Sequence, residues 1–195
     1  MKLRTIRKLA FKRRRAGVTD YALRTRLLKS RLPFLVVRSS NRYVYAQIVS
    51  PTISGDRTFA SASSKELVKF GWRLGFASTP AAYLVGYLIG LRAADLGISS
   101  AILNMGLSTP TKGNKVFAVV DGAIEAGLEI PRQEEASIPK ERLYGKHIAE
   151  YIEKVREKSE PSIQFSKIIG ETIDIEAEVL KVKEKMKSAL KKEGT

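Results

Sequence analysis

The residues of this sequence with the clearest chemical potential are cations, and they are concentrated near its start. Residues 1–50 hold 14 of the 35 Lys and Arg residues but only one of the 20 acidic residues, Asp20. The first quarter of the chain therefore carries a net charge of +13 out of a total of +15. A segment this one-sided repels itself and is stabilised by a polyanion. Nucleic acid and an anionic membrane are the two candidates, and an ordinary solvated face is the plainer alternative.

Aromatic and polar side chains are interleaved with these cations in a pattern typical of contact with unpaired nucleotides. Arg and Lys neutralise phosphates without reading sequence, whereas tyrosine rings and guanidinium planes stack on exposed bases. Core packing is an equal alternative for Tyr43 and Tyr45, which would share one face of a strand. The predicted RNA-binding residues are Lys12, Arg13, Arg14, Arg15, Thr19, Asp20, Tyr21, Arg24, Arg26, Lys29, Arg38, Ser40, Asn41, Arg42, Tyr43, Lys112 and Lys115.

Two of these lysines lie in a loop that invites comparison with phosphate-binding motifs. The segment 109–115 reads TPTKGNK, which lacks the G-x-x-x-x-G-K-S/T order of a P-loop. Backbone amides together with Lys112 and Lys115 would still suit one phosphate of a polynucleotide. An ordinary loop is an equal alternative.

Other residue types give no support to enzyme chemistry. The chain has no Cys, which excludes disulfides, thiolate catalysis and cysteine zinc sites. The single His147 lies in a polar segment and is expected at the surface. General acid–base catalysis requires carboxyl groups placed in a pocket. The glutamates at 134–135, 176 and 178 lie instead among mixed charges. The sequence predicts no enzymatic activity, metal, cofactor or small-molecule substrate.

Membrane and export signals are also weak. The longest apolar stretch, 80–94, is too short to span a bilayer and is interrupted by Gly86, Gly90 and Arg92. The N-terminus lacks the continuous apolar region of a signal peptide. A mitochondrial transit peptide is a rival interpretation of the acid-free first 19 residues, but the cationic pattern continues to Arg42. We expect a cytoplasmic protein that keeps its basic segment and does not bind a membrane.

Three parts are predicted to position these residues: a basic arm with a short helix (1–32), an α/β core (33–131) and a charged helical extension (132–195). In the arm, Asp20 is placed to cap a helix over 21–29. The core is expected to begin with strands over 34–38, 43–49 and 57–61, the first two forming an antiparallel hairpin.

The rest of the core is predicted to continue with a longer helix and two further strands. Thr79 and Pro80 give a capped start to a helix reaching Leu96, and Gly86 and Gly90 are expected to let it pack closely on a sheet. The remaining predicted elements are a helix over 65–70, strands over 101–105 and 115–120, and a helix over 122–126. This order predicts an α/β fold with a mixed sheet flanked by helices.

Two helices are predicted in the extension, over 140–158 and 175–192. The second carries a stripe of apolar residues at spacings of three and four, which is typical of a helix docked on its own domain or on a partner protein. The residues of the stripe are Ile175, Val179, Val182, Met186 and Leu190.

Several short motifs together resemble one family, the archaeal form of the 5S-rRNA-binding ribosomal protein numbered eighteen in the large subunit. The resemblance extends over residues 10–151 and ends with HIAEY at 147–151. Its motifs are RRR at 13–15, TDY at 19–21, TRLLKS at 25–30, VVRSSN at 36–41, AQ at 46–47, SAS at 61–63, GW at 71–72, PTKGNKVFAV at 110–119 and DGAIEAGLEIP at 121–131.

This resemblance implies a component of the large ribosomal subunit that is seated with 5S rRNA at the central protuberance. It implies 5S rRNA, 23S rRNA and neighbouring large-subunit ribosomal proteins as partners, and an α/β domain similar to ribonuclease H. Such nucleases carry acids on the first strand, and 34–38 has none, so nuclease activity is not implied. The alternatives are another basic nucleic-acid-binding protein and, less favoured, an RNA-processing enzyme.

Overall fold

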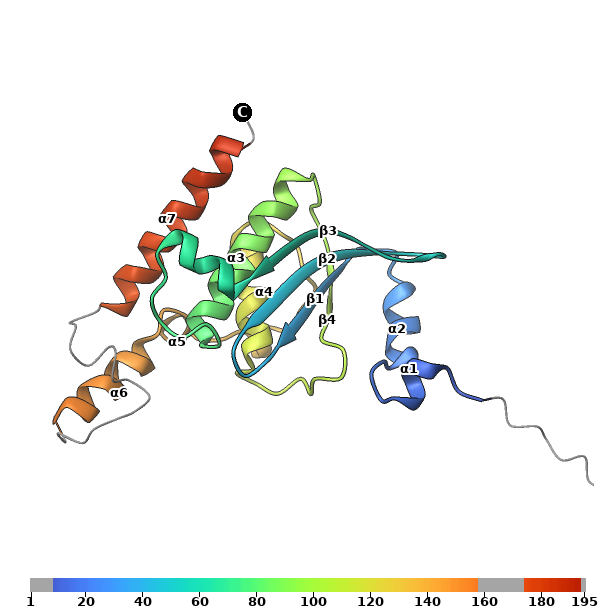
Figure 1. Cartoon of the computed structure of the whole chain (residues 1–195), viewed down its shortest axis with the longest axis horizontal. Helices are drawn as coiled ribbons and strands as arrows, with labels where there is room; N and C mark the ends of the chain where they lie inside the picture. The colour runs from blue at the N-terminus through green and yellow to red at the C-terminus, as the bar shows by residue number, and fades with distance from the viewer. Residues whose placement is uncertain (1–8, 158–173, 194–195) are drawn as a thin grey trace, which may run out of the picture.

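The computed structural model describes residues 9–157 and 174–193. Its centre is a four-stranded mixed sheet in the order β3-β2-β1-β4 (Figure 1). The pairs β1–β2 and β2–β3 are antiparallel, whereas β4 lies parallel to β1. The strands are β1 (Phe34–Ser39), β2 (Val44–Thr52), β3 (Gly55–Ser63) and β4 (Ile102–Asn104). The predicted hairpin and the third strand are confirmed, and β4 is a shortened form of the strand predicted over 101–105.

One face of the sheet is apolar because successive side chains of a strand point to opposite faces. Leu35 and Val37 of β1 and Ile48 of β2 are fully or almost fully buried on this face. It is covered by the helices α3 (Thr79–Asp95) and α4 (Lys115–Glu125) (Figure 1). These contacts confirm the predicted α/β class with a mixed sheet flanked by helices.

Helix α3 is apolar on all sides, as expected of a helix enclosed within a core. Every residue from 79 to 90 is buried. Its N-cap is Ser78, whose hydroxyl accepts from the Ala81 N–H at 3.3 Å, with Pro80 in the first turn. The predicted cap, Thr79, is therefore wrong by one residue, because Thr79 itself has entered the helix.

The glycines of α3 approach a helix rather than the sheet, which corrects the prediction made for them. A Cβ atom on Gly86 would collide with the carbonyl of Val119, and one on Gly90 would collide with Ala126, both in or at the end of α4. Gly122 of α4 faces the carbonyl of Tyr83 in the same way. Small residues on both helices thus let the two backbones pack in direct contact.

The strand predicted over 115–120 is wrong, because these residues form the first half of α4. A short run of apolar, β-branched residues is shared by buried strands and buried helices, and periodicity alone does not separate them. Asn114 favours the helix locally, because its side chain accepts from the Val116 N–H at 3.1 Å and caps the first turn. Helix α4 packs against both α3 and β1, and its residues 116–123 are all buried, so this stretch lacks the polar face of a surface helix.

Shorter helices complete the core. A 3₁₀ helix, η1 (Ser64–Phe70), follows β3 where a helix was predicted over 65–70. Ser63 and Glu66 form a reciprocal capping box at its start. The remaining elements before residue 157 are η2 (Glu134–Ala136), α5 (Lys140–Leu143) and α6 (Lys146–Glu157). The single helix predicted over 140–158 is divided at Gly145, which has φ +87°, and residue 158 lies outside the described residues.

The last helix, α7 (Ile175–Glu193), confirms the prediction over 175–192 and packs on α3 on the side away from the sheet (Figure 1). Four residues of the predicted stripe are at most 1% exposed: Ile175, Val179, Val182 and Met186. The side chain of Leu190 lies outside the described part of the chain. Of the two expected positions for the stripe, the structure shows docking on the chain's own domain.

The arm contains α1 (Lys12–Arg15) and α2 (Tyr21–Leu28) and lies on the other side of the sheet from α3 and α4 (Figure 1). Helix α2 approaches the end of the sheet where β2 turns into β3. The sheet face beside the arm carries polar and exposed side chains, and only part of it is covered.

Candidate nucleic-acid interface

Helix α2 is built as the sequence predicts. The carboxylate of Asp20 accepts from the N–H groups of Ala22 at 2.8 Å and Leu23 at 3.0 Å, satisfying two donors that the first turn leaves without partners. Leu27 is the one buried side chain of this helix. Because the helix buries so little apolar surface, polar contacts must fix its position.

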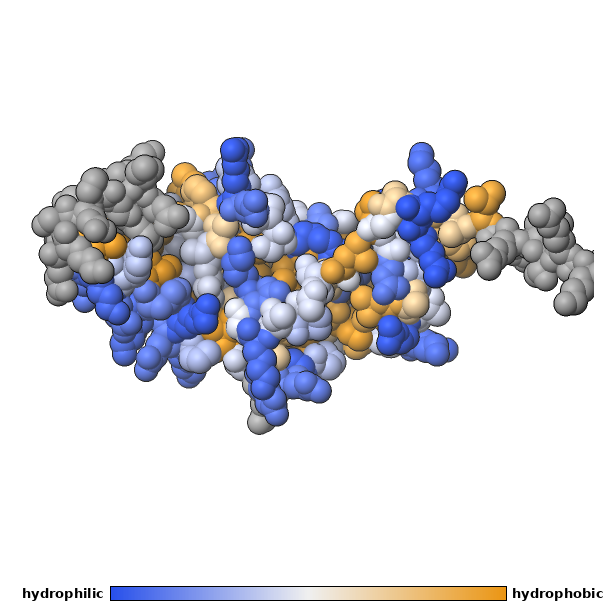
Figure 2. Space-filling model, turned by 90° about the horizontal axis from the view of Figure 1, so that it is seen from below, coloured by the Kyte–Doolittle hydropathy of each residue, from blue (hydrophilic) through white to orange (hydrophobic). Residues whose placement is uncertain are grey.

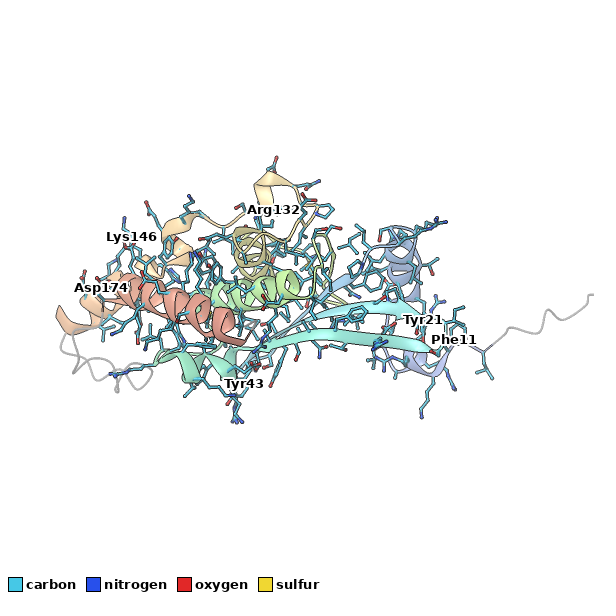
Figure 3. The ribbon with its side chains drawn as sticks, turned by 90° about the horizontal axis from the view of Figure 1, so that it is seen from above. Phe11, Tyr21, Tyr43, Arg132, Lys146 and Asp174 are labelled. Carbon is cyan, nitrogen blue, oxygen red and sulfur yellow. The ribbon has the colours of Figure 1, made fainter. Side chains whose placement is uncertain are left out.

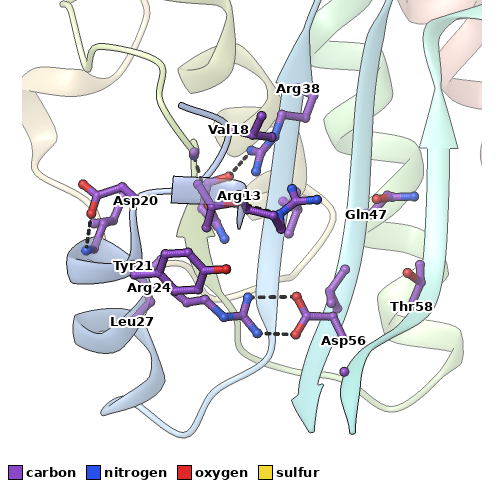
Figure 4. Close-up of a pocket in the computed structure, with 17 residues that line it drawn as sticks. Arg13, Val18, Asp20, Tyr21, Arg24, Leu27, Arg38, Gln47, Asp56 and Thr58 are labelled. Carbon is purple, nitrogen blue, oxygen red and sulfur yellow. Dashed lines mark hydrogen bonds and ion pairs between the residues drawn. The ribbon is translucent and has the colours of Figure 1, made fainter. Parts of the chain in front are cut away.

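The main polar contact between the arm and the sheet is an ion pair of Arg24 with Asp56. The two residues are 32 positions apart, and the guanidinium and carboxylate meet through two parallel hydrogen bonds, one of them Arg24 Nη1 to Asp56 Oδ2 at 2.8 Å (Figure 4). Hydrogen bonding to Asp56 raises the pKa of Arg24 above its usual value. The bidentate geometry fixes direction as well as distance, so it sets the orientation of α2 against β3.

The turn between α1 and α2 is held by two further contacts. Arg13 Nε donates to the Thr19 hydroxyl at 2.9 Å. The ring of Tyr21 packs on that of Phe11 with centroids 5.0 Å apart (Figure 3). These predicted site residues are thus engaged in shaping the arm, and Arg13 keeps its two terminal nitrogens for other partners.

Seven cations of the described arm are exposed and form no ion pair with any residue in 9–157 or 174–193. Arg13 is hydrogen-bonded to Thr19, and Arg31 lies beyond the end of α2. We call the other five the free arm cations: Lys12, Arg14, Arg15, Arg26 and Lys29. Strongly hydrophilic side chains project from the arm, at the right of Figure 2, next to apolar ones. Within the described arm the only acid is Asp20, which caps α2. Positive charge therefore accumulates here without compensation.

The turn between β1 and β2 forms a second group of predicted site residues, at the opposite end of the sheet from Asp56. Tyr43, just before β2, and Pro51 near its end are eight positions apart, roughly 26 Å at about 3.3 Å per position. Ser40 closes the turn, since its hydroxyl accepts from the Tyr43 N–H at 2.9 Å. Asn41 and Arg42 are exposed at its tip. The tyrosine itself is half-buried and stacks on Phe76 with centroids 5.9 Å apart, away from Tyr21 (Figure 3).

The other predicted site residues lie between or beyond these groups. Arg38 folds back along the sheet, donating from Nη1 to the carbonyls of Val37 at 2.7 Å and Asn104 at 3.0 Å. Partial burial lowers the pKa of its guanidinium. Lys112 pairs with Glu135 at 2.9 Å, both exposed, and Lys115 begins α4. The structure thus brings the arm residues together but leaves the β1–β2 turn and the two lysines apart from them.

A cleft of about 570 Å³ separates the arm from the uncovered face of the sheet (Figure 4). Residues that sequence reasoning missed line it, among them Gln47, Asp56, Thr58 and Asn104. Their contribution depends on strand register and on the position of α2, which local patterns do not encode. Of these residues, only Asp56 could have been singled out from the sequence, because it and Asp20 are the only acids among residues 1–60.

The described residues also bear on two other kinds of site, a metal site and a membrane-spanning helix. Among the described residues, no group of three or more His, Cys, Asp and Glu side chains is placed to hold a metal ion. The described helices include none that is both long and apolar enough to cross a membrane.

A basic α/β protein with uncompensated cations on one arm belongs to a class that binds polyanions, and comparison with known proteins places it in the ribosome. The family model described as "Ribosomal large subunit proteins 60S L5, and 50S L18" matches residues 7–99. The chain is 49% identical over 172 residues to the large ribosomal subunit protein uL18 of Caldivirga maquilingensis, covering 87% of this chain and 83% of the relative.

Two further uL18 relatives give the same result. The Halorubrum lacusprofundi protein is 51% identical over 150 residues, covering 77% of this chain and 81% of the relative. The Korarchaeum cryptofilum protein is 44% identical over 159 residues, covering 82% of each. The chain belongs to the uL18 family of large ribosomal subunit proteins. It is a structural ribosomal protein rather than an enzyme, and its family places it in the ribosome, in the cytoplasm.

Proposed function

We propose that the chain binds 5S rRNA and helps to attach it to the central protuberance of the large subunit. Membership of the uL18 family supplies the ribosomal role, and the resemblance described above suggests 5S rRNA as the partner. The observation that carries the proposal is the set of free arm cations, five exposed charges without an ion pair in the described residues. Such charges gain most from RNA phosphates, because phosphate binding releases condensed counterions.

The proposal gives each part of the chain a role. The free arm cations neutralise phosphates, while Arg13 and Arg24 keep the arm in position. The β1–β2 turn, with Asn41 and Arg42 exposed at its tip, makes a separate RNA contact about the length of a strand away. The core (33–131) holds the arm and the turn at this spacing. The described helices of the extension face 23S rRNA or neighbouring ribosomal proteins.

A salt titration of binding tests the identity of the RNA. Binding of the full chain to 5S rRNA is measured with tRNA and duplex DNA of similar length as competitors. We expect tight binding that is selective for 5S rRNA and persists at moderate salt. Contacts with the shape of the RNA and with unpaired bases should add affinity to that of the phosphate contacts. Equal binding to all three nucleic acids would refute the proposal of 5S rRNA as the specific partner.

Variants of the free arm cations test the surface. Replacing Lys12, Arg14 and Arg15 with Ala should weaken binding and lower the slope of log affinity against log salt by about 0.7–0.9 for each lost phosphate contact. The matched control replaces Lys69, Lys154 and Lys181, three exposed cations outside the arm, and should leave the slope close to that of the wild type. An equal effect of both triple variants would show that total charge, not the arm, determines binding.

A further inference from the structure

We infer that the cleft between the arm and the sheet receives one unpaired nucleotide of the bound RNA. This inference rests on the proposed function and adds to it a site with a defined ligand. The cleft is lined on one side by α1, α2 and the turn between them, and on the other by β1, β2, β3 and the C-terminal end of β4 (Figure 4).

The floor of the cleft presents hydrogen-bonding groups suited to the edge of a base. Gln47 lies at the centre of the sheet, paired with Val36 of β1 and Ser61 of β3, with its side chain on the uncovered face. This side chain is exposed and forms no hydrogen bond with any residue in the described ranges, so its amide offers both a donor and an acceptor. Thr58 adds a hydroxyl beside it (Figure 4).

The rim of the cleft is suited to a phosphate. Arg13, Arg24 and Arg38 line it against two acids. Both acids are already bound, Asp20 to the first turn of α2 and Asp56 to Arg24. Arg13 uses only Nε for Thr19, and Arg38 uses Nη1 for backbone carbonyls, so each retains a free N–H-bearing nitrogen. The net field at the rim is therefore positive, and these donors are available to an anion.

The dimensions and position of the cleft favour a single nucleotide of a larger RNA. A volume of about 570 Å³ falls in the range of sites that enclose one small ligand. A paired base cannot enter, because its edge is held within a helix whose major groove is too narrow for side chains. The cleft lies directly beside the free arm cations, which would hold the flanking phosphates. Tyr21, also in its lining, offers an aromatic ring for contact with the base.

Chemical probing of 5S rRNA tests this inference at the level of single nucleotides. The complex is treated with dimethyl sulfate and with a carbodiimide, which modify the Watson–Crick edges of unpaired bases. With the wild-type chain we expect protection of at least one unpaired base. With Gln47→Ala that base should regain reactivity while the rest of the footprint persists. Affinity should fall about tenfold, equivalent to about 1.4 kcal/mol, with an unchanged salt slope.

The matched control is Ser61→Ala, which alters the neighbour of Gln47 on the same sheet face but outside the lining of the cleft. It should leave both footprint and affinity unchanged. A Gln47→Ala footprint identical to that of the wild type would overturn the inference without touching the proposed function. Absence of any 5S-selective footprint with the wild-type chain would instead overturn the proposed function. Protection that is lost equally in both variants would show a general effect of the sheet face and also refute the cleft as a site.

Discussion

The two ends of the described chain are both helical, yet they are attached to the core in opposite ways. Helix α7 buries four apolar side chains against the core, each at most 1% exposed. Helix α2 buries only Leu27, at 9% exposure, and is positioned by the Arg24–Asp56 ion pair and the Asp20 cap. Apolar burial stabilises by about 25 cal/mol per Å², whereas a partly exposed ion pair contributes at most about 1 kcal/mol.

The helix that stabilises the fold is therefore not the segment that is proposed to bind RNA. Helix α7 is a component of the hydrophobic core, and its removal would expose α3. The arm contributes little to the core, so its sequence is free to carry charge. Its few internal bonds fix direction while leaving the free arm cations exposed. We therefore expect substitutions in α7 to change the free energy of unfolding, and substitutions in the arm to change RNA binding.

The largest effect is expected for Met186→Ala in α7. Met186 is fully buried, and truncating a buried Met, Leu or Ile costs about 2–5 kcal/mol through lost transfer energy and the cavity that remains. Denaturant unfolding of the isolated protein measures this change. The control is Leu180→Ala in the same helix, where the side chain is 46% exposed and the cost should be small. Equal destabilisation by both variants would contradict the assignment of one face of α7 to the core.

The second prediction tests whether RNA binding by the arm depends on the position of α2 or only on the net charge of the chain. Asp56→Asn makes the chain more positive, so electrostatics alone would strengthen RNA binding. If the ion pair positions α2, binding should instead weaken, by about fivefold for the loss of about 1 kcal/mol. The matched control is Asp95→Asn at the exposed end of α3, which makes the same charge change elsewhere. Tighter binding by Asp56→Asn would refute the positioning role.

The same contrast explains how much of the fold could be predicted from the sequence. Elements with alternating or amphipathic patterns, such as β2 and α7, are predicted within a few residues, because each has one buried and one exposed face. Residues 115–120, the first half of α4, are predicted as a strand because α4 packs on both α3 and β1 and is buried over 116–123, which leaves no polar face there. The division at Gly145 was missed, since its φ of +87° depends on the chain reversal into α6.

For the candidate site, composition predicted which segment carries the charge but not which charges are free. Arg24 and Arg14 look equivalent in the sequence. Only the position of Asp56, 32 residues away from Arg24, separates a structural arginine from an exposed one. The cleft depends in the same way on the register that places Gln47 opposite Val36. Contacts between distant residues are set by tertiary packing, and a local pattern contains no record of them.

A smaller effect is expected for Asp20→Ala, which removes the cap of α2. Loss of an N-cap costs about 1 kcal/mol, and we expect it to appear as faster amide hydrogen exchange in α2, with the unfolding of the core unchanged. Asp20→Asn is the control, because it loses the same charge but keeps an oxygen that accepts from the Ala22 and Leu23 N–H groups. If both variants exchange equally fast, the charge of Asp20 rather than its capping bonds is responsible.

The smallest effect concerns a polar cluster beside α7, where Lys183 hydrogen-bonds the Tyr83 hydroxyl at 2.9 Å and pairs with Glu125. Partial burial alone would raise the pKa of the Glu125 carboxyl, but hydrogen bonds from Lys183 and Tyr83 outweigh it and hold this pKa below the usual 4.5. A carboxyl with a lowered pKa in the folded state stabilises the fold above its unfolded pKa. That contribution is lost as the pH falls through the folded value.

Thermal melts of the wild type and Glu125→Gln between pH 7 and pH 3 measure this contribution. We expect the wild type to melt at a higher temperature at neutral pH, and the difference to narrow as the pH falls below 4.5. The difference should be small, because the Glu125 side chain is 46% exposed and solvent screens the pair. Glu129→Gln, at another exposed position, serves as the control and should show no such narrowing. A constant gap across this range would mean that the carboxylate charge does not help to hold α7, and that its apolar stripe acts alone.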